Sequence, residues 1–116
     1  MDATTTPVST VFTGPEVDRI PAVPLGPNPG VTHRVLWQDG TSMAGVLTVG
    51  AGCRLGTHTH RVNDHHIWVL EGHAFVLGRE IGPGSYAYEP SGVEHDIDAS
   101  GTEGCTVFYL YVHQAD

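Results

Sequence analysis

The chain has 116 residues and a net charge of −8, with 13 acidic residues against five arginines and no lysine. This length fits one domain, whose folding hides about two-thirds of the unfolded chain's surface and needs no disulfide framework. The few basic residues are scattered, which argues against nucleic-acid binding. No apolar run approaches the roughly 18 residues of a membrane span, so we expect neither a span nor a signal peptide, and we expect a cytoplasmic protein.

Residues 1–30 differ in composition from the rest of the chain, because six of the eight prolines fall there. Proline fixes φ and removes an amide donor, so this stretch is predicted to be an extended arm, with Val8–Phe12 as its one candidate strand. Two interpretations of residues 1–30 stay open, a frayed tail and an arm that packs on a partner subunit.

Residues 31–116 are predicted to form one all-β domain, because short runs rich in Val, Tyr and Thr alternate with glycine turns. Strands at this spacing indicate an antiparallel sandwich or small barrel, and no window shows a helical period with caps. The predicted strands are Val31–Gln38, Met43–Val49, Arg54–Thr59, His65–Glu71, Ala74–Leu77, Ser85–Glu89, His95–Asp98 and Thr106–His113. The two cysteines, Cys53 and Cys105, are expected to be reduced core thiols.

Histidine is overabundant, with eight in the chain and five of them between His58 and His73. His58 and His60 are two residues apart, so on a strand their imidazoles point to the same face and can converge on one ion. Taken alone, the pair is weak evidence for a metal site and is better explained as two surface histidines.

The spacing around this pair resembles the two motifs of the cupin superfamily. In that family they read G-x5-H-x-H-x(3,4)-E-x6-G and G-x5-P-x-G-x2-H-x3-N. Here they appear as Gly52, His58, His60, His65 and Gly72, followed by Gly84, Pro90, Gly92 and His95. The resemblance implies a single antiparallel, jelly-roll-like cupin β-barrel that binds a metal, preceded by the proline-rich arm.

The chain departs from the cupin motifs at two positions, since His65 occupies the glutamate position and Ala99 the final asparagine position. The resemblance implies one divalent transition metal ion (Zn, Fe, Ni or Mn) with His58, His60, His65 and His95 as its ligands. Without His65, the centre would have three histidines. Four neutral imidazoles leave the full charge on the ion, which makes it a stronger Lewis acid.

By resemblance, the function lies among small cupins that handle carbonyl-rich substrates, such as aromatic polyketide cyclases and three-histidine Fe(II) dioxygenases. An octahedral ion with four histidines keeps two open positions, and a bidentate diketonate would fill both and leave none for O2. This favours a polyketide cyclase that performs a metal-assisted aldol cyclisation. No catalytic protein residue is identified, and a metal-bound water is the expected base.

Two alternatives to the cyclase stay open. One is an Fe(II) dioxygenase that cleaves a C–C bond of a diketone or hydroxyacetophenone. The other is a non-catalytic metal-binding or sensor cupin, in which four protein ligands close the site.

Aromatic residues on the predicted strands are expected to pack the core and to line a cavity beside the metal. Such a cavity suits a small aromatic or polyketide-like substrate. Apolar outer faces and free sheet edges lead us to expect a homodimer. The aromatic residues concerned are Trp37, Trp68, Phe75, Tyr86, Tyr88, Phe108, Tyr109 and Tyr111.

Overall fold

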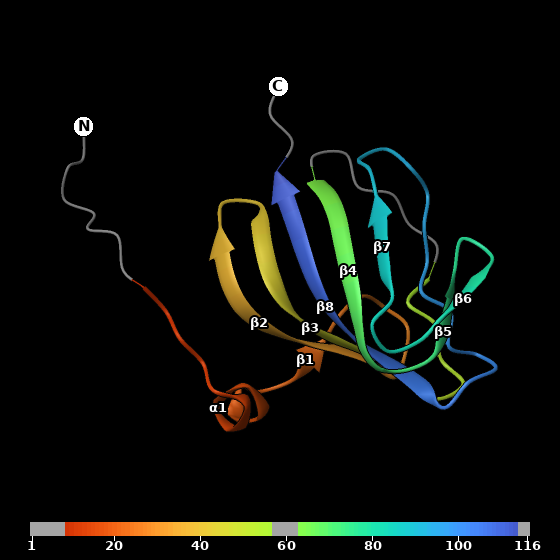
Figure 1. Cartoon of the computed structure of the whole chain (residues 1–116), viewed down its shortest axis with the longest axis horizontal. Coiled ribbons are helices and arrows are strands. Elements are labelled where there is room, and N and C mark those ends of the chain that lie inside the picture. Colours follow the sequence, from red (N-terminus) through yellow and green to blue (C-terminus); the bar gives the residue numbers. More distant parts are fainter. Residues whose placement is uncertain (1–8, 57–62, 114–116) are drawn as a thin grey trace.

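A computed structural model describes residues 9–56 and 63–113, which fold around one antiparallel six-stranded sheet (Figure 1). Its strand order is β1-β2-β3-β8-β4-β7, so neighbouring strands come from distant parts of the chain. The all-β antiparallel prediction is therefore confirmed. The strands are β1 (Val23–Pro24), β2 (Val31–Asp39), β3 (Ser42–Gly50), β4 (Asn63–Gly72), β7 (Tyr86–Glu89) and β8 (Gly104–His113).

A second layer of short segments faces this sheet. It contains the hairpin of β5 (Ala74–Val76) and β6 (Arg79–Ile81), together with bridges from Asp98 to Arg54 and to Phe75. The strands predicted at 54–59 and 95–98 are thus only isolated bridges within the described residues. Gly56, the last residue described in the first segment, has a φ of 102°, and the turn closed by the hydrogen bond from the Val93 amide to the Pro90 carbonyl precedes the second.

The core lies between the two layers and follows the alternating burial of β3, β4 and β8. On β3, Leu47 and Val49 point inward, and on β4, Ile67 and Val69 do the same. Successive side chains on a strand point to opposite faces, so their neighbours point outward. The remaining core members are Val31, Ala74, Val76, Ile97, Ala99, Cys105, Val107 and Tyr109.

The segment predicted to be an arm, residues 1–30, contains a helix, α1 (Gly14–Arg19), that was not predicted. Thr13 and Glu16 form a reciprocal capping box, and Pro15 stands in the first turn, where its missing amide costs nothing. Residues 9–12 of the candidate strand at 8–12 form no strand, because the chain there leads into the helix cap. Further on, β1 pairs with β2, so this part of the arm joins the sheet.

Gly45 on β3 makes room for the side chain of Tyr109. The Tyr109 hydroxyl lies 2.9 Å from His33 Nδ1, and a Cβ at position 45 would collide with that hydroxyl and with the Arg34 carbonyl oxygen. Because Tyr109 is fully buried, the ring cannot move aside without disturbing the core.

We therefore expect Gly45→Ala to lower the free energy of unfolding by about 2–3 kcal/mol, the cost of overpacking a tight core. Gly14→Ala is the matched control, since a Cβ there has no neighbour within 4 Å and no positive φ is required. Urea unfolding followed by circular dichroism measures both variants. An unchanged midpoint for Gly45→Ala would show that β3 and Tyr109 can shift apart freely.

Candidate metal centre

Two of the four predicted ligands, His65 and His95, are brought together inside the fold. Their ring centroids are 4.9 Å apart, and both side chains are buried. His65 points inward from the start of β4, while His95 follows the turn after β7. His58 and His60 lie outside the described residues, and their ligation stays a prediction.

Glu89 joins this pair and was not predicted as a site residue. It is the last residue of β7 and lies directly across from His65 in the β4–β7 register. One potential ligand atom from each of His65, Glu89 and His95 lies within 4.8 Å of the others. We call these three residues the buried triad.

The Glu89 carboxylate is in an unfavourable environment without a cation. Its side chain is 2% exposed, and its Oε2 atom has no hydrogen-bond partner among the described residues. Burial, with a smaller contribution from the negative charge of Asp96, raises the pKa of Glu89 to about 7. A buried carboxylate needs a compensating charge or hydrogen bonds, so a bound cation would relieve this cost.

The donor set fits a transition metal ion. Two imidazole nitrogens and a carboxylate oxygen are the ligands that Zn²⁺ and non-haem Fe²⁺ take in proteins. Calcium and magnesium prefer oxygen-only sites. The buried triad is therefore chemically suited to hold one divalent transition metal.

Neighbouring groups fix the ring position of His65 and the tautomer of His95. The Tyr111 ring stacks on His65 at 3.7 Å between centroids and 12° between planes. His95 Nδ1 lies 3.1 Å from the Val93 carbonyl oxygen, which can only accept, so Nδ1 carries the proton. This tautomer leaves His95 Nε2 as the nitrogen with the ligand lone pair.

Asp96 ties the segment that precedes His58 to the residue after His95. Its carboxylate pairs with the Arg54 guanidinium and accepts the Gly56 amide at 2.8 Å. Asn28 adds hydrogen bonds to the carbonyls of Arg54 and Leu55. The chain is thus anchored two residues before His58.

The remaining described histidines lie outside the buried triad, and each has another partner. His33 pairs with Tyr109, His66 with Tyr86, His73 with Glu103, and His113 with Thr41.

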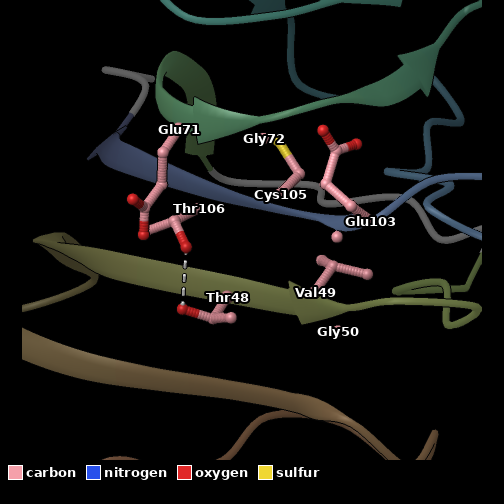
Figure 2. Close-up of a pocket in the computed structure, with 9 residues that line it drawn as sticks. Thr48, Val49, Gly50, Glu71, Gly72, Glu103, Cys105 and Thr106 are labelled. Atoms are coloured by element: carbon pink, nitrogen blue, oxygen red, sulfur yellow. Dashed lines mark hydrogen bonds between the residues drawn. The ribbon is translucent and has the colours of Figure 1, made fainter.

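A separate pocket of about 280 Å³ lies at the other end of β4 and β8 (Figure 2). Thr48 and Thr106 share a hydrogen bond in its wall, and Glu71 stands across from Thr106. Glu71 is six residues from His65 on β4, about 20 Å along an extended strand. The pocket is therefore distinct from the buried triad.

Burial raises the pKa of the Cys105 thiol at the edge of this pocket to about 11.

Residues 13–115 match the family of ChrR cupin-like domains. The chain belongs to this cupin family. The predicted cupin fold is confirmed, and the family match begins inside the predicted arm at residue 13. Among curated proteins, no relative matches the chain significantly.

Solved cupins share the fold at low sequence identity. The RmlC-like cupin of Shewanella frigidimarina has a TM-score of 0.74 and 19% identity, with 93% of each chain covered. The polyketide cyclase RemF from Streptomyces resistomycificus has a TM-score of 0.72 and 24% identity, covering 91% of this chain and 79% of RemF. KdgF from a Halomonas species has a TM-score of 0.70 and 17% identity, covering 90% and 96%. At these identities the comparisons establish the fold alone.

Within the described residues, no helix of this cupin is long and apolar enough to cross a membrane.

Proposed function

We propose that this cupin is a metal-dependent enzyme that cyclises an enolisable, carbonyl-rich substrate of the polyketide type. The observation that carries the proposal is the buried triad, a transition-metal donor set enclosed in a cupin fold. The structural similarity to the polyketide cyclase RemF supports the choice of substrate class.

His65, His95 and Glu89 would hold the metal, with His58 and His60 as further proposed ligands. When bound, the metal would supply Lewis-acid stabilisation of the enolate that an aldol cyclisation requires. The burial of His65 and Glu89 keeps bulk water away from this position, and exclusion of water strengthens the electrostatic interactions there.

Tyr111 and Val93 hold the two histidines in position before any substrate binds. The stacked Tyr111 ring restricts rotation of His65, and the Val93 carbonyl holds His95 in one tautomer. Preorganised groups of this kind lower the cost of reaching the reactive geometry.

A second candidate, an Fe(II) dioxygenase that cleaves a C–C bond, is favoured by one specific observation. Two histidines and one carboxylate are the ligand set of many non-haem Fe(II) oxygenases, and the buried triad has this composition. The same cluster therefore suits iron as well as zinc.

Metal analysis combined with oxygen uptake on a panel of diketones and poly-β-ketones separates these functions. We expect a divalent metal at about one per chain and ring-closed products without O2 consumption. Iron with O2 consumed in proportion to substrate would overturn the cyclase in favour of the dioxygenase. A tightly bound metal with no turnover of any substrate would support a non-catalytic cupin instead.

A further inference from the structure

A row of stacked rings runs along the inner face of the sheet, starting at the buried triad. Tyr111 is the cross-strand neighbour of His65 and stacks on it at 3.7 Å between ring centroids. Tyr109, two residues earlier on β8, stacks on Tyr111 at 4.5 Å. We call His65, Tyr111 and Tyr109 the ring row. The π orbitals of rings in contact overlap, so an electron passes along such a row more readily than through saturated side chains.

The hydroxyl of Tyr109 has a partner that ring packing does not require. Stacked aromatic rings are common in protein cores, but this hydroxyl lies 2.9 Å from His33 Nδ1, on a side chain that is fully buried. His33 is its hydrogen-bond partner within the described part of the chain. A buried O–H group needs an acceptor. The phenolic O–H therefore donates to Nδ1, and the ring proton of His33 is on Nε2.

His33 is placed to take up the phenolic proton of Tyr109. Burial lowers the pKa of His33, so its ring is neutral near pH 7 with the Nδ1 lone pair directed at Tyr109. Burial also raises the pKa of Tyr109 to about 12, so the phenol keeps its proton at rest. Removal of an electron makes a phenol strongly acidic, and a base within hydrogen-bond reach then accepts the proton. His33 is partly exposed, so this proton can pass on to solvent.

Glycine at position 45 serves the contact between Tyr109 and His33. Gly45 lies inside β3 and has no positive φ, so its backbone conformation does not call for glycine. Glycine inside a strand weakens it and often marks a close approach of another group. Here that group is the Tyr109 hydroxyl, which a Cβ at position 45 would displace. The chain thus keeps an unfavourable residue on β3 where it makes room for this hydroxyl.

We propose that Tyr109 is a redox-active tyrosine that gives an electron to a redox-active metal at the buried triad and its phenolic proton to His33. The electron passes through the rings of Tyr111 and His65. Hydrogen peroxide is the co-reactant. Its reduction to two water molecules takes up two protons from solvent and two electrons, one from a ferrous ion and one from Tyr109.

Tyr109 becomes a neutral radical in this step, and His33 becomes an imidazolium ion. The reaction draws an oxidising equivalent away from the imidazoles around the metal, so its function is to protect His65 and His95 from oxidation. The inference rests on the metal centre of the proposed function, and it does not depend on cyclisation.

A second tyrosine–histidine pair on the outer face of the sheet is the matched control. The Tyr86 hydroxyl lies 2.7 Å from His66 Nδ1, so the same two groups are in contact there. Tyr86 is 49% exposed, and His66 lies on the opposite face of β4 from His65. Within the described residues, the ring contacts of His65 lead to Tyr111 and His95 and not to this pair. An oxidant formed at the metal should therefore oxidise Tyr109, whereas an oxidant in solution should oxidise Tyr86.

The test uses the full chain loaded with Fe(II) under anaerobic conditions, mixed with hydrogen peroxide and frozen for electron paramagnetic resonance. We expect a tyrosyl radical, identified by its narrower signal with ring-deuterated tyrosine, that is lost in Tyr109→Phe and retained in Tyr86→Phe. His33→Asn should lower the radical yield about 100-fold, the size of a general-base contribution. The asparagine oxygen can accept the hydrogen bond but not the proton. In the metal-free protein, hexachloroiridate(IV) should instead oxidise Tyr86.

Peptide mass spectrometry gives a second readout. After peroxide treatment, His65 and His95 should gain oxygen atoms in Tyr109→Phe and stay unmodified in the wild type. Iron content is measured on every sample, and circular dichroism verifies that each variant folds.

Three results would overturn the proposal. With iron bound, the absence of a tyrosyl radical, or a radical that is lost in Tyr86→Phe rather than in Tyr109→Phe, would exclude Tyr109 as the electron donor and leave the metal centre intact. A wild-type radical yield in His33→Asn would exclude His33 as the proton acceptor. A chain that takes up no iron would overturn both the redox role of Tyr109 and the metal centre.

Discussion

Replacing His65 with alanine is expected to remove the metal from the purified protein, whereas replacing the adjacent His66 leaves metal content unchanged. His65 is buried beside Glu89 and His95, while His66 lies on the opposite face of β4 and hydrogen-bonds to the Tyr86 hydroxyl. Loss of His65 removes one coordination bond to the metal. The ion beside the buried Glu89 carboxylate then has one protein ligand fewer. We expect metal affinity to fall at least 100-fold, measured by elemental analysis and by competition with a chromophoric chelator.

The pair of variants separates ligation from a general effect of losing an imidazole on β4. His66→Ala removes the same group one residue away, so a fall in metal content for both variants would point to damage of the strand rather than of the site. Full occupancy in His65→Ala would instead exclude His65 as a ligand. The centre would then rest on His95 and Glu89 together with the proposed His58 and His60.

The long strands and two of the three residues of the buried triad could be predicted from sequence, the strands from their alternation and the two histidines from the resemblance to the cupin motifs. The alternation from Val31 onward defines β2 and β3, and the motif intervals bring His65 and His95 together. Glu89 could not be predicted in this way, since its contact with His65 depends on the register between β4 and β7. That register spans 24 residues and two intervening strands, which no local pattern encodes.

The local pattern in the sequence Tyr86-Ala87-Tyr88-Glu89 leads to the wrong placement of Glu89. Alternation places both tyrosines on one face and the glutamate on the other. On a half-buried strand the aromatic side would normally be taken as the core side, which would leave Glu89 in solvent. The structure has the reverse arrangement, with the tyrosines exposed and Glu89 buried. The burial of Glu89 has a proposed reason, the metal on the inner face.

The helix α1 was missed for a different reason. The many prolines of residues 1–30 favour an extended chain, so the short capping box was overlooked. In it, the side chains of Thr13 and Glu16 each accept a hydrogen bond from the other residue's backbone amide. Six residues are too few to show a helical period, so only the capping residues indicate this helix.

Replacing Glu89 with glutamine should have opposite effects on metal binding and on the stability of the metal-free protein. The amide is a much poorer ligand than the carboxylate, so we expect metal affinity to fall at least 10-fold. Burial raises the pKa of Glu89 from 4.5 to about 7, so between these values the folded metal-free protein binds more protons than the unfolded chain. Its free energy of unfolding must then fall as the pH rises through this range, by up to about 3 kcal/mol in total.

Glutamine cannot ionise, so Glu89→Gln should unfold at higher urea than the wild type at pH 8 and at about the same urea at pH 4.5, both measured in EDTA. His65 and His95 face the same carboxyl group, and the difference between the two proteins isolates Glu89 and its coupling to them. Glu80→Gln on β6, where the side chain is exposed, is the matched control and should behave as the wild type. Equal midpoints for Glu89→Gln and wild type at pH 8 would mean that the carboxylate is compensated without a metal. Unchanged metal affinity in the variant would exclude Glu89 as a ligand.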